Sequence, residues 1–222
     1  MSLGEFGLLF SLPLWLQNVL GYSAFGTGVI LLSLAVGSIL ASGAGGALGA
    51  KRGPVFVVQL GIFLELLGVA GIALIISPTT KVILIIIPLF IYGLGVGLAT
   101  AQLTGVALSQ IPVEKSGQAS GMTSTTRQIG SALGIAILGT VLFASFGSNL
   151  RDAVPDQRLS SAIVNSAGGA IEALSRDPKN DYIVEQSKEA LTQGSRTSAY
   201  VASAFLLIGW FATRSLSRKE SR

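Results

Sequence analysis

Residues 6–50, FGLLFSLPLWLQNVLGYSAFGTGVILLSLAVGSILASGAGGALGA, contain no charged side chain. As a single helix this stretch would be about 68 Å long, twice the ~30 Å hydrocarbon core of a bilayer. It must therefore fold back once, and Gly21-Tyr22-Ser23 is the place where a turn fits. Residues 82–113 and 128–150 are also uncharged. Runs of this length are typical of membrane spans, so we predict an integral membrane protein of the all-α class.

The predicted architecture is a bundle of six transmembrane helices that forms one membrane domain over residues 1–222. Turns rich in glycine, proline and charge separate the spans, as at Lys51-Arg52-Gly53-Pro54 and Ser77-Pro78. The spans are predicted at about 6–20, 25–49, 55–77, 82–109, 117–146 and 197–213. An extracytoplasmic loop over 147–196 and a cytoplasmic tail over 214–222 complete the chain.

The predicted loop over 147–196 has its own pattern. Apolar residues recur at three- and four-residue spacing from Leu159 to Leu174 and again from Ile183 to Leu191. Two short amphipathic helices separated by Asp177-Pro178 fit this pattern. The favoured interpretation is a solvated cap on the membrane surface, and the alternative is a ligand-binding module.

Composition excludes several classes of protein. Half of the residues are hydrophobic and 12% are charged, whereas soluble domains carry roughly 25% charge. The chain has neither cysteine nor histidine, which removes disulfides, thiol catalysis and most transition-metal sites. No nucleophile has a base partner, and no phosphate-binding glycine loop is present. We therefore predict a protein that is not an enzyme and that needs no metal or cofactor.

The basic residues indicate the orientation in the membrane. Lysine and arginine in short loops favour the cytoplasmic side, and seven of these residues fall on one side of a six-span bundle. Both termini are then cytoplasmic. Basic residues in the long loop lie opposite, interleaved with acidic ones. A nucleic-acid partner is not expected, because the net charge of +4 is spread over loops and tail. The seven residues are Lys51, Arg52, Lys115, Arg214, Arg218, Lys219 and Arg222.

Glu65 is an acidic residue near the middle of a predicted span. An ionisable residue in hydrocarbon is costly and is therefore a functional candidate. Gly61 and Gly68 lie four and three residues away on the same helical face, which predicts that Glu65 points into the bundle. A carboxylate buried there can take up and release a proton. The alternative is that Glu65 pairs with a polar neighbour or faces another subunit.

Arg127 is the second ionisable residue within a predicted span, in the polar run TSTTRQ at residues 123–128. It can reach the membrane interface as a structural anchor, or it can take part in gating or substrate contact. Further polar groups in the spans are weaker candidates for the lining of a cavity. They are Gln128, Gln17, Asn18, Gln102 and Thr104.

Two segments resemble the major facilitator superfamily, and in particular its fourteen-helix drug/proton antiporters. Residues 6–23, FGLLFSLPLWLQNVLGYS, are similar to the first helix of that family's carboxy-terminal half. Residues 117–141, GQASGMTSTTRQIGSALGIAILGTV, are similar to its penultimate helix. The resemblance implies proton-coupled efflux of drugs or amphipathic organic molecules, with small substrates, protons and the lipid bilayer as partners. It also implies location in a bacterial plasma membrane.

The turn after the second predicted span departs from the family pattern. The family usually carries an aspartate among glycines and basic residues there, and this turn helps to lock one conformation. Here the position of the aspartate is taken by Ala50. This departure removes the acidic member of the charge network that the resemblance implies for this gating turn. The candidate residues of the turn are Gly46, Lys51, Arg52, Gly53 and Pro54.

The predicted number of helices sets a condition on transport. A transporter of this family encloses its substrate between two six-helix halves, and this chain supplies one. We therefore expect it to pair with a second six-helix half or to form a homo-oligomer. The alternative is a membrane interaction subunit that does not transport, or a truncated transporter remnant.

Overall fold

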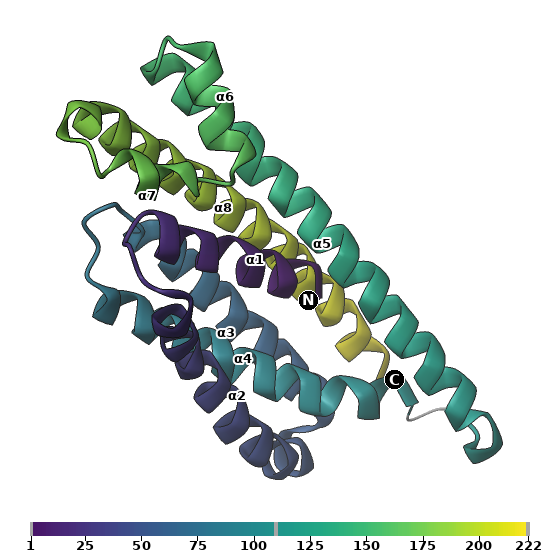
Figure 1. The fold of residues 1–222 in the computed structure, drawn as a ribbon. Coiled ribbons are helices and arrows are strands. Elements are labelled where there is room, and N and C mark those ends of the chain that lie inside the picture. The colour runs from purple at the N-terminus through teal and green to yellow at the C-terminus, as the bar shows by residue number, and fades with distance from the viewer. Residues whose placement is uncertain (1, 109–110, 221–222) are drawn as a thin grey trace.

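The computed structural model describes residues 2–108 and 111–220, with the backbone alone at 3, 6, 7, 104, 107, 108, 113 and 214–220. Every regular element in these residues is a helix (Figure 1), so the predicted all-α class is confirmed. The long helices are α1 (Ser2–Asn18), α2 (Ala24–Arg52), α3 (Pro54–Ile75), α4 (Val82–Leu108), α5 (Ser116–Ala153) and α8 (Asp181–Glu220). The short elements are η1 (Val113–Lys115), α6 (Gln157–Asn165), α7 (Ala170–Leu174) and η2 (Pro178–Asn180).

Local sequence signals separate the first three helices. Gly21 has a φ of 75° in the turn between α1 and α2, and the Ser23 hydroxyl then caps α2 by accepting from the Gly26 amide at 3.1 Å. Gly53 joins α2 to α3 with a φ of 86°, a conformation that side chains other than glycine rarely adopt. Pro54 follows as the first residue of α3, where its missing amide proton removes no intrahelical hydrogen bond.

Helix α4 lies between α2 and α3 and packs closely on both. A Cβ atom at Gly93 would overlap the backbone carbonyl of Leu34 on α2. On the opposite face of α4, a Cβ atom at Gly95 would lie 2.5 Å from the carbonyl oxygen of Gly61 on α3. Glycines at these contacts allow the helix backbones to approach each other, as is common in membrane bundles. Helices α2, α3 and α4 therefore form one tightly packed group.

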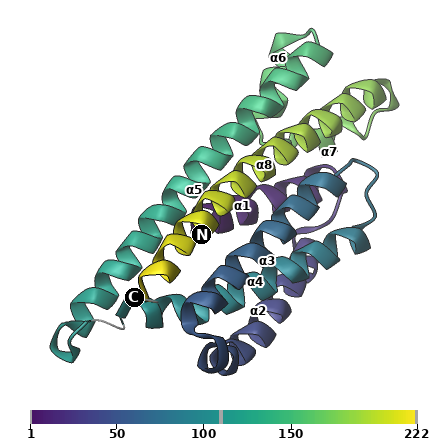
Figure 2. The ribbon, with the colours of Figure 1, turned by 180° about the vertical axis from the view of Figure 1, so that it is seen from behind.

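Helices α1, α5 and α8 form a second group, which α8 joins to α3. A Cβ atom at Gly194 of α8 would lie 2.7 Å from the Leu142 carbonyl oxygen of α5. The Ser198 hydroxyl of α8 donates to the Leu138 carbonyl of α5 at 3.0 Å. Seen from behind, α8 runs alongside α5 on the side of α3 (Figure 2). The core of the bundle thus extends through both groups.

Four helical segments are long and apolar enough to cross a membrane: α2, α3, Val82–Leu103 of α4, and α5. The sequence predicts six spans. The remaining two long helices, α1 and α8, complete the bundle without meeting this criterion in the described residues. Helix α1 has 17 residues. Helix α8 carries charged side chains as far as Arg196, so that its longest uncharged part is residues 197–213.

The predicted loop over residues 147–196 is largely helical in the structure. Helix α5 continues to Ala153, and α8 begins at Asp181, well before the span predicted at 197–213. Hydropathy does not reveal such extensions, because a helix that continues beyond the apolar layer becomes amphipathic. Leu191 in the early part of α8 is fully buried. The predicted break at Asp177-Pro178 is present, and the second predicted amphipathic helix is the start of α8. The first is divided into α6 and α7, because Ala167 and Gly168 have positive φ between them.

A buried hydrogen bond between α1 and α8 gives a test of the packing. The Trp15 indole N–H donates to the Thr192 hydroxyl at 2.9 Å, and both side chains are fully buried. Thr192→Val leaves the indole N–H without a partner and should lower the free energy of unfolding in detergent micelles by about 1–3 kcal/mol. Trp15→Phe should lower the free energy of unfolding less in the Thr192→Val variant than in the otherwise unmodified chain. The exposed Thr140→Val variant is the control, and additive losses would contradict a direct bond.

Candidate functional site

The Glu65 carboxyl group on α3 is the centre of the candidate site. Its side chain is 0% exposed, and neither carboxylate oxygen has a hydrogen-bond partner among the described residues. Burial of a carboxyl group without a partner costs free energy. A feature that costs stability in this way points to a function.

The packing of α3 against α4 directs Glu65 into the bundle. A Cβ atom at Gly95 of α4 would lie 2.9 Å from the Glu65 Cγ atom. Gly68, one turn further along α3, faces Tyr92 and Pro88 of α4 just as closely. The glycines on both sides of Glu65 therefore place it against α4 rather than lipid, which is the orientation that their spacing predicts.

Glu5 of α1 is a second buried carboxyl group in the same region. Its side chain is 9% exposed, one of its oxygens has no hydrogen-bond partner among the described residues, and it interacts electrostatically with Glu65. Glu5 is not among the predicted site residues, because it directly precedes the uncharged run and has the position of a boundary residue. The spacing of apolar residues does indicate its burial, because Leu8, Leu12 and Leu16 continue the helical face of Glu5. All three leucines are buried.

Tyr92 of α4 and Arg127 of α5 complete the group. Tyr92 is fully buried, its hydroxyl has no hydrogen-bond partner among the described residues, and it interacts electrostatically with both carboxyl groups. Arg127 is half-buried and interacts electrostatically with Glu5. We call Glu5, Glu65, Tyr92 and Arg127 the carboxyl cluster. Its members come from four helices, α1, α3, α4 and α5, and no ion pair joins them within the described residues.

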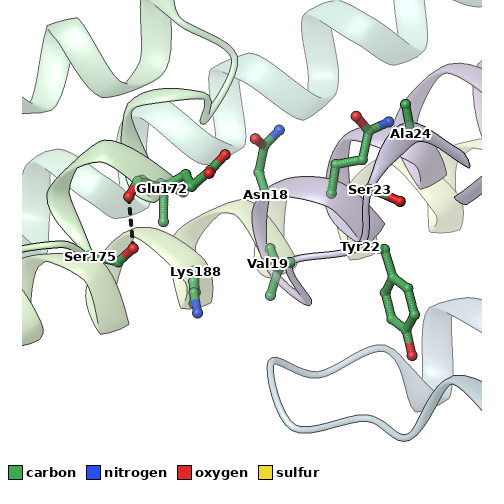
Figure 3. Close-up of a pocket in the computed structure, with 11 residues that line it drawn as sticks. Asn18, Val19, Tyr22, Ser23, Ala24, Glu172, Ser175 and Lys188 are labelled. Carbon is green, nitrogen blue, oxygen red and sulfur yellow. Dashed lines mark hydrogen bonds between the residues drawn. The ribbon is translucent and has the colours of Figure 1, made fainter. Parts of the chain in front are cut away.

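Gln17 and Asn18 lie elsewhere, in a pocket at the carboxyl end of α1. This pocket has a volume of about 490 Å³ between the α1–α2 turn, α7 and α8. The Asn18 side-chain amide donates to the Ala167 carbonyl oxygen at 3.2 Å. In Figure 3, Asn18 lies between α7, which carries Glu172, and the α1–α2 turn with Ser23. The pocket is therefore polar and is formed in part by the segment that links α5 to α8.

The other polar candidates do not join one site. The Gln102 amide of α4 donates to the Gly45 carbonyl oxygen of α2 at 3.0 Å, so Gln102 ties these two helices together. Gln128 is exposed on α5. The side chain of Thr104 lies outside the described part of the chain. Of the predicted gating or substrate-contact residues, Arg127 is the one with a charge interaction with Glu5, and the two form no ion pair in the described part of the chain.

The predicted gating turn is a sharp connection between α2 and α3. Lys51 and Arg52 are exposed in the last turn of α2, and Gly53 and Pro54 follow. The Arg52 guanidinium lies 5.7 Å from the centre of the Phe56 ring, a cation–π contact. Neither basic residue forms an ion pair within the described chain. The missing acidic residue at position 50 thus leaves the turn without an ionic partner. Gly46 is exposed and has open space beside it.

The helical bundle, its apolar outer faces and its buried carboxyl groups define a multi-pass integral membrane protein. Residues 1–135 match the model of the Major Facilitator Superfamily. The chain therefore belongs to the Major Facilitator Superfamily.

Characterised relatives point to the same family. Multidrug resistance protein Stp of Mycobacterium tuberculosis is 33% identical over 226 residues, which cover 92% of this chain and 41% of Stp. Multidrug efflux pump LfrA of Mycolicibacterium smegmatis is 29% identical, with the same coverage of 92% and 41%. The tetracycline resistance determinant of Streptomyces rimosus is 26% identical over 87% of this chain and 54% of that protein. These relatives are drug-resistance and efflux proteins. The chain spans about two-fifths of the length of Stp and LfrA.

Proposed function

We propose that this chain is the carboxy-terminal six-helix half of a fourteen-helix drug/proton antiporter that exports amphipathic organic molecules. The observation that carries the proposal is Glu65, a carboxyl group buried in the close contact between α3 and α4 without a hydrogen-bond partner among the described residues. A proton antiporter needs a group that binds a proton in one conformation and releases it in another. Glu65 suits such a role, because it is shielded from water and forms no ion pair with any residue that the structure describes.

A second half is the proposed partner. The chain covers 41% of Stp, and its helices α2 and α5 carry large apolar side chains on their outer faces. Apolar faces of this kind suit lipid or another helical half. A homo-oligomer is the alternative partner. The exposed side chains are Phe25, Val29, Leu32, Val36, Ile39 and Leu40 on α2 and Met122, Ile129, Leu133, Ile135 and Ile137 on α5.

We propose that the end of the bundle with the α2–α3 turn and η1 faces the cytoplasm of a bacterium. Lys51, Arg52 and Lys115 lie at this end, and the positive-inside rule favours the cytoplasm for such residues. Both termini are then cytoplasmic, and the α6–α7 region lies outside the plasma membrane. Attachment of a membrane-impermeant maleimide to Arg176→Cys in intact cells, but not to Lys51→Cys, would support this orientation. The reverse pattern would contradict it.

Complementation tests the proposed function. The chain is expressed together with the part of Stp that precedes the aligned region, in cells that lack their own drug efflux pumps. Ethidium export, measured by the loss of fluorescence after glucose is added, is expected from the pair but from neither half alone. Absence of export from a pair shown to assemble by co-purification would overturn the proposal and favour a subunit that does not transport or a remnant.

A further inference from the structure

The pocket at the carboxyl end of α1 is separate from the carboxyl cluster. It is formed by three segments that are distant in the sequence: the α1–α2 turn, α7 and the first half of α8. Its volume of about 490 Å³ is in the range of binding sites for small organic molecules. In Figure 3, Glu172 and Ser175 of α7 lie on one side of Asn18, and Ser23 and Ala24 at the start of α2 lie on the other.

The α7 wall of this pocket is fixed to the rest of the bundle. The Asn18 side-chain amide donates to the Ala167 carbonyl oxygen, just before α7, at 3.2 Å. Gly168 follows with a φ of 87°, and a Cβ atom there would lie 3.0 Å from Leu191 and 3.3 Å from Asn18. Ile171 anchors α7 itself and is 1% exposed. The pocket is therefore enclosed by elements that are packed in place.

Lys188 of α8 gives the pocket an unpaired positive charge. Its side chain borders the pocket, is half-buried and forms no ion pair within the described residues. Glu172 is the acidic residue of the wall, and its carboxylate lies 3.8 Å from the Arg176 guanidinium. Because this pair is exposed, water and Arg176 weaken the field of Glu172 in the pocket. Two positive charges and one negative charge leave the surroundings of the cavity positive.

Neutral groups of the pocket add hydrogen-bond donors. Helix α2 begins at Ala24, and the first amides of a helix lack intrahelical acceptors and carry the positive end of its dipole. The Ser23 hydroxyl oxygen accepts from the Gly26 amide, which leaves its own proton available to a ligand. The Gln17 side-chain amide borders the pocket as well. A negatively charged ligand with several acceptor oxygens matches this set of donors.

The pocket lies at the boundary of the membrane-spanning part of the bundle. The apolar segment of α2 begins at Ala24, on the edge of the pocket. On α8, the uncharged part begins at residue 197, fewer than three helical turns beyond Lys188. Lipid phosphate groups occupy this level, where the hydrocarbon core gives way to the polar headgroups. A phosphate group can therefore reach the pocket from a lipid or from solution.

We propose that this pocket binds a phosphate group, with Lys188 as its charged contact and the amides of Gln17 and of the start of α2 as neutral donors. Lysine suits this role as a compact charge with three donors. The phosphate group belongs either to an anionic lipid or to a soluble organic phosphate, and the chemistry in the pocket is the same. The inference goes beyond the proposed antiport and does not rest on it, because the pocket shares no residue with the carboxyl cluster.

Two pairs of ligands that differ only in the phosphate group test the proposal on the purified chain in an uncharged detergent. Glycerol 3-phosphate is compared with glycerol by isothermal titration calorimetry. Dioleoylphosphatidic acid is compared with dioleoylglycerol by native mass spectrometry. Saturable binding of at least one phosphate compound, and of neither phosphate-free compound, is expected, and the compound that binds identifies the source as soluble or lipid. Absence of saturable binding of both phosphate compounds would overturn the proposal.

Variants of Lys188 locate the bound phosphate group. Lys188→Gln is expected to lower its affinity about 10-fold or more, because the substitution removes a charge-assisted hydrogen bond. Lys188→Arg keeps the positive charge and should keep most of the affinity. Lys179→Gln is the matched control, since it removes an exposed lysine outside the pocket and should change the affinity less than about twofold. Equal affinity in Lys188→Gln and the unmodified chain would overturn the proposal.

Glu172→Gln distinguishes a phosphate site from a site for a zwitterion. Loss of the carboxylate should raise the affinity for the phosphate compound roughly two- to threefold, because a repulsive charge is removed from the wall. A ligand held by both Lys188 and Glu172 would instead bind more weakly to this variant, and that result would overturn the assignment to a phosphate group. Size-exclusion profiles and thermal unfolding of each variant verify that it is folded before affinities are compared.

Discussion

Glu65→Gln is expected to abolish proton-driven export by the assembled transporter, with a loss of about 100-fold or more in the ethidium export rate. Glutamine has nearly the same shape but cannot bind and release a proton in the relevant range, and a positioned proton-transfer group commonly contributes at least this factor. The rate is measured in energised inverted vesicles with and without a collapsed proton gradient. The control is Glu114→Gln, which removes an exposed carboxyl group and should leave export unchanged.

The same substitution should not unfold the protein. It replaces a carboxyl group that has no partner among the described residues with a neutral amide, so the midpoint of thermal unfolding in detergent should stay equal or rise. This second measurement separates loss of coupling from loss of structure. Export by Glu65→Gln that still depends fully on the proton gradient would contradict the assigned role.

Gly93→Ala is expected to disrupt the packing of α2 on α4 and to lower the free energy of unfolding by about 2–3 kcal/mol. The added methyl group would overlap the Leu34 carbonyl, and a backbone group in a helix cannot turn aside as a flexible side chain does. Helices α2 and α4 must then separate. Steric trapping in detergent micelles measures the free energy.

Gly28→Ala is the matched control for this prediction. It adds the same methyl group to α2 at a position with nothing within 4 Å, so its effect should stay within about 0.5 kcal/mol. Equal effects of the two substitutions would show that the cost comes from helix propensity or lipid contact and not from the α2–α4 contact.

Much of the fold is predictable from the sequence because membrane spans leave a strong signal. Uncharged runs, the proline after Gly53 and the turn at Gly21 define the first four helices to within a few residues. The start of α8 is not predictable in this way. Its first turns carry Asp181, Glu185 and Lys188 beside buried Val184 and Leu191, a pattern that hydropathy cannot distinguish from a loop with a short amphipathic helix.

The candidate site was predictable in part. Glu65 is predictable from the cost of a carboxyl group in hydrocarbon and from its neighbouring glycines. Arg127 is predictable as an ionisable residue in the polar run at residues 123–128 of a predicted span. Tyr92 gives no such signal, because an aromatic residue in a span usually serves packing. Glu5 stands at the edge of an uncharged run. Its burial becomes visible only when α1 packs against α5 and α8.

The lengths of α5 and α8 have a practical consequence for structure determination. At 1.5 Å per residue, their 38 and 40 residues extend for about 57 and 60 Å, twice the ~30 Å hydrocarbon core. The α6–α7 segment at their far end (Figure 1) therefore stands clear of the detergent belt. A compact soluble domain inserted between Arg176 and Asp177, both exposed, would serve as a fiducial for electron cryomicroscopy of a chain of only 22.8 kDa.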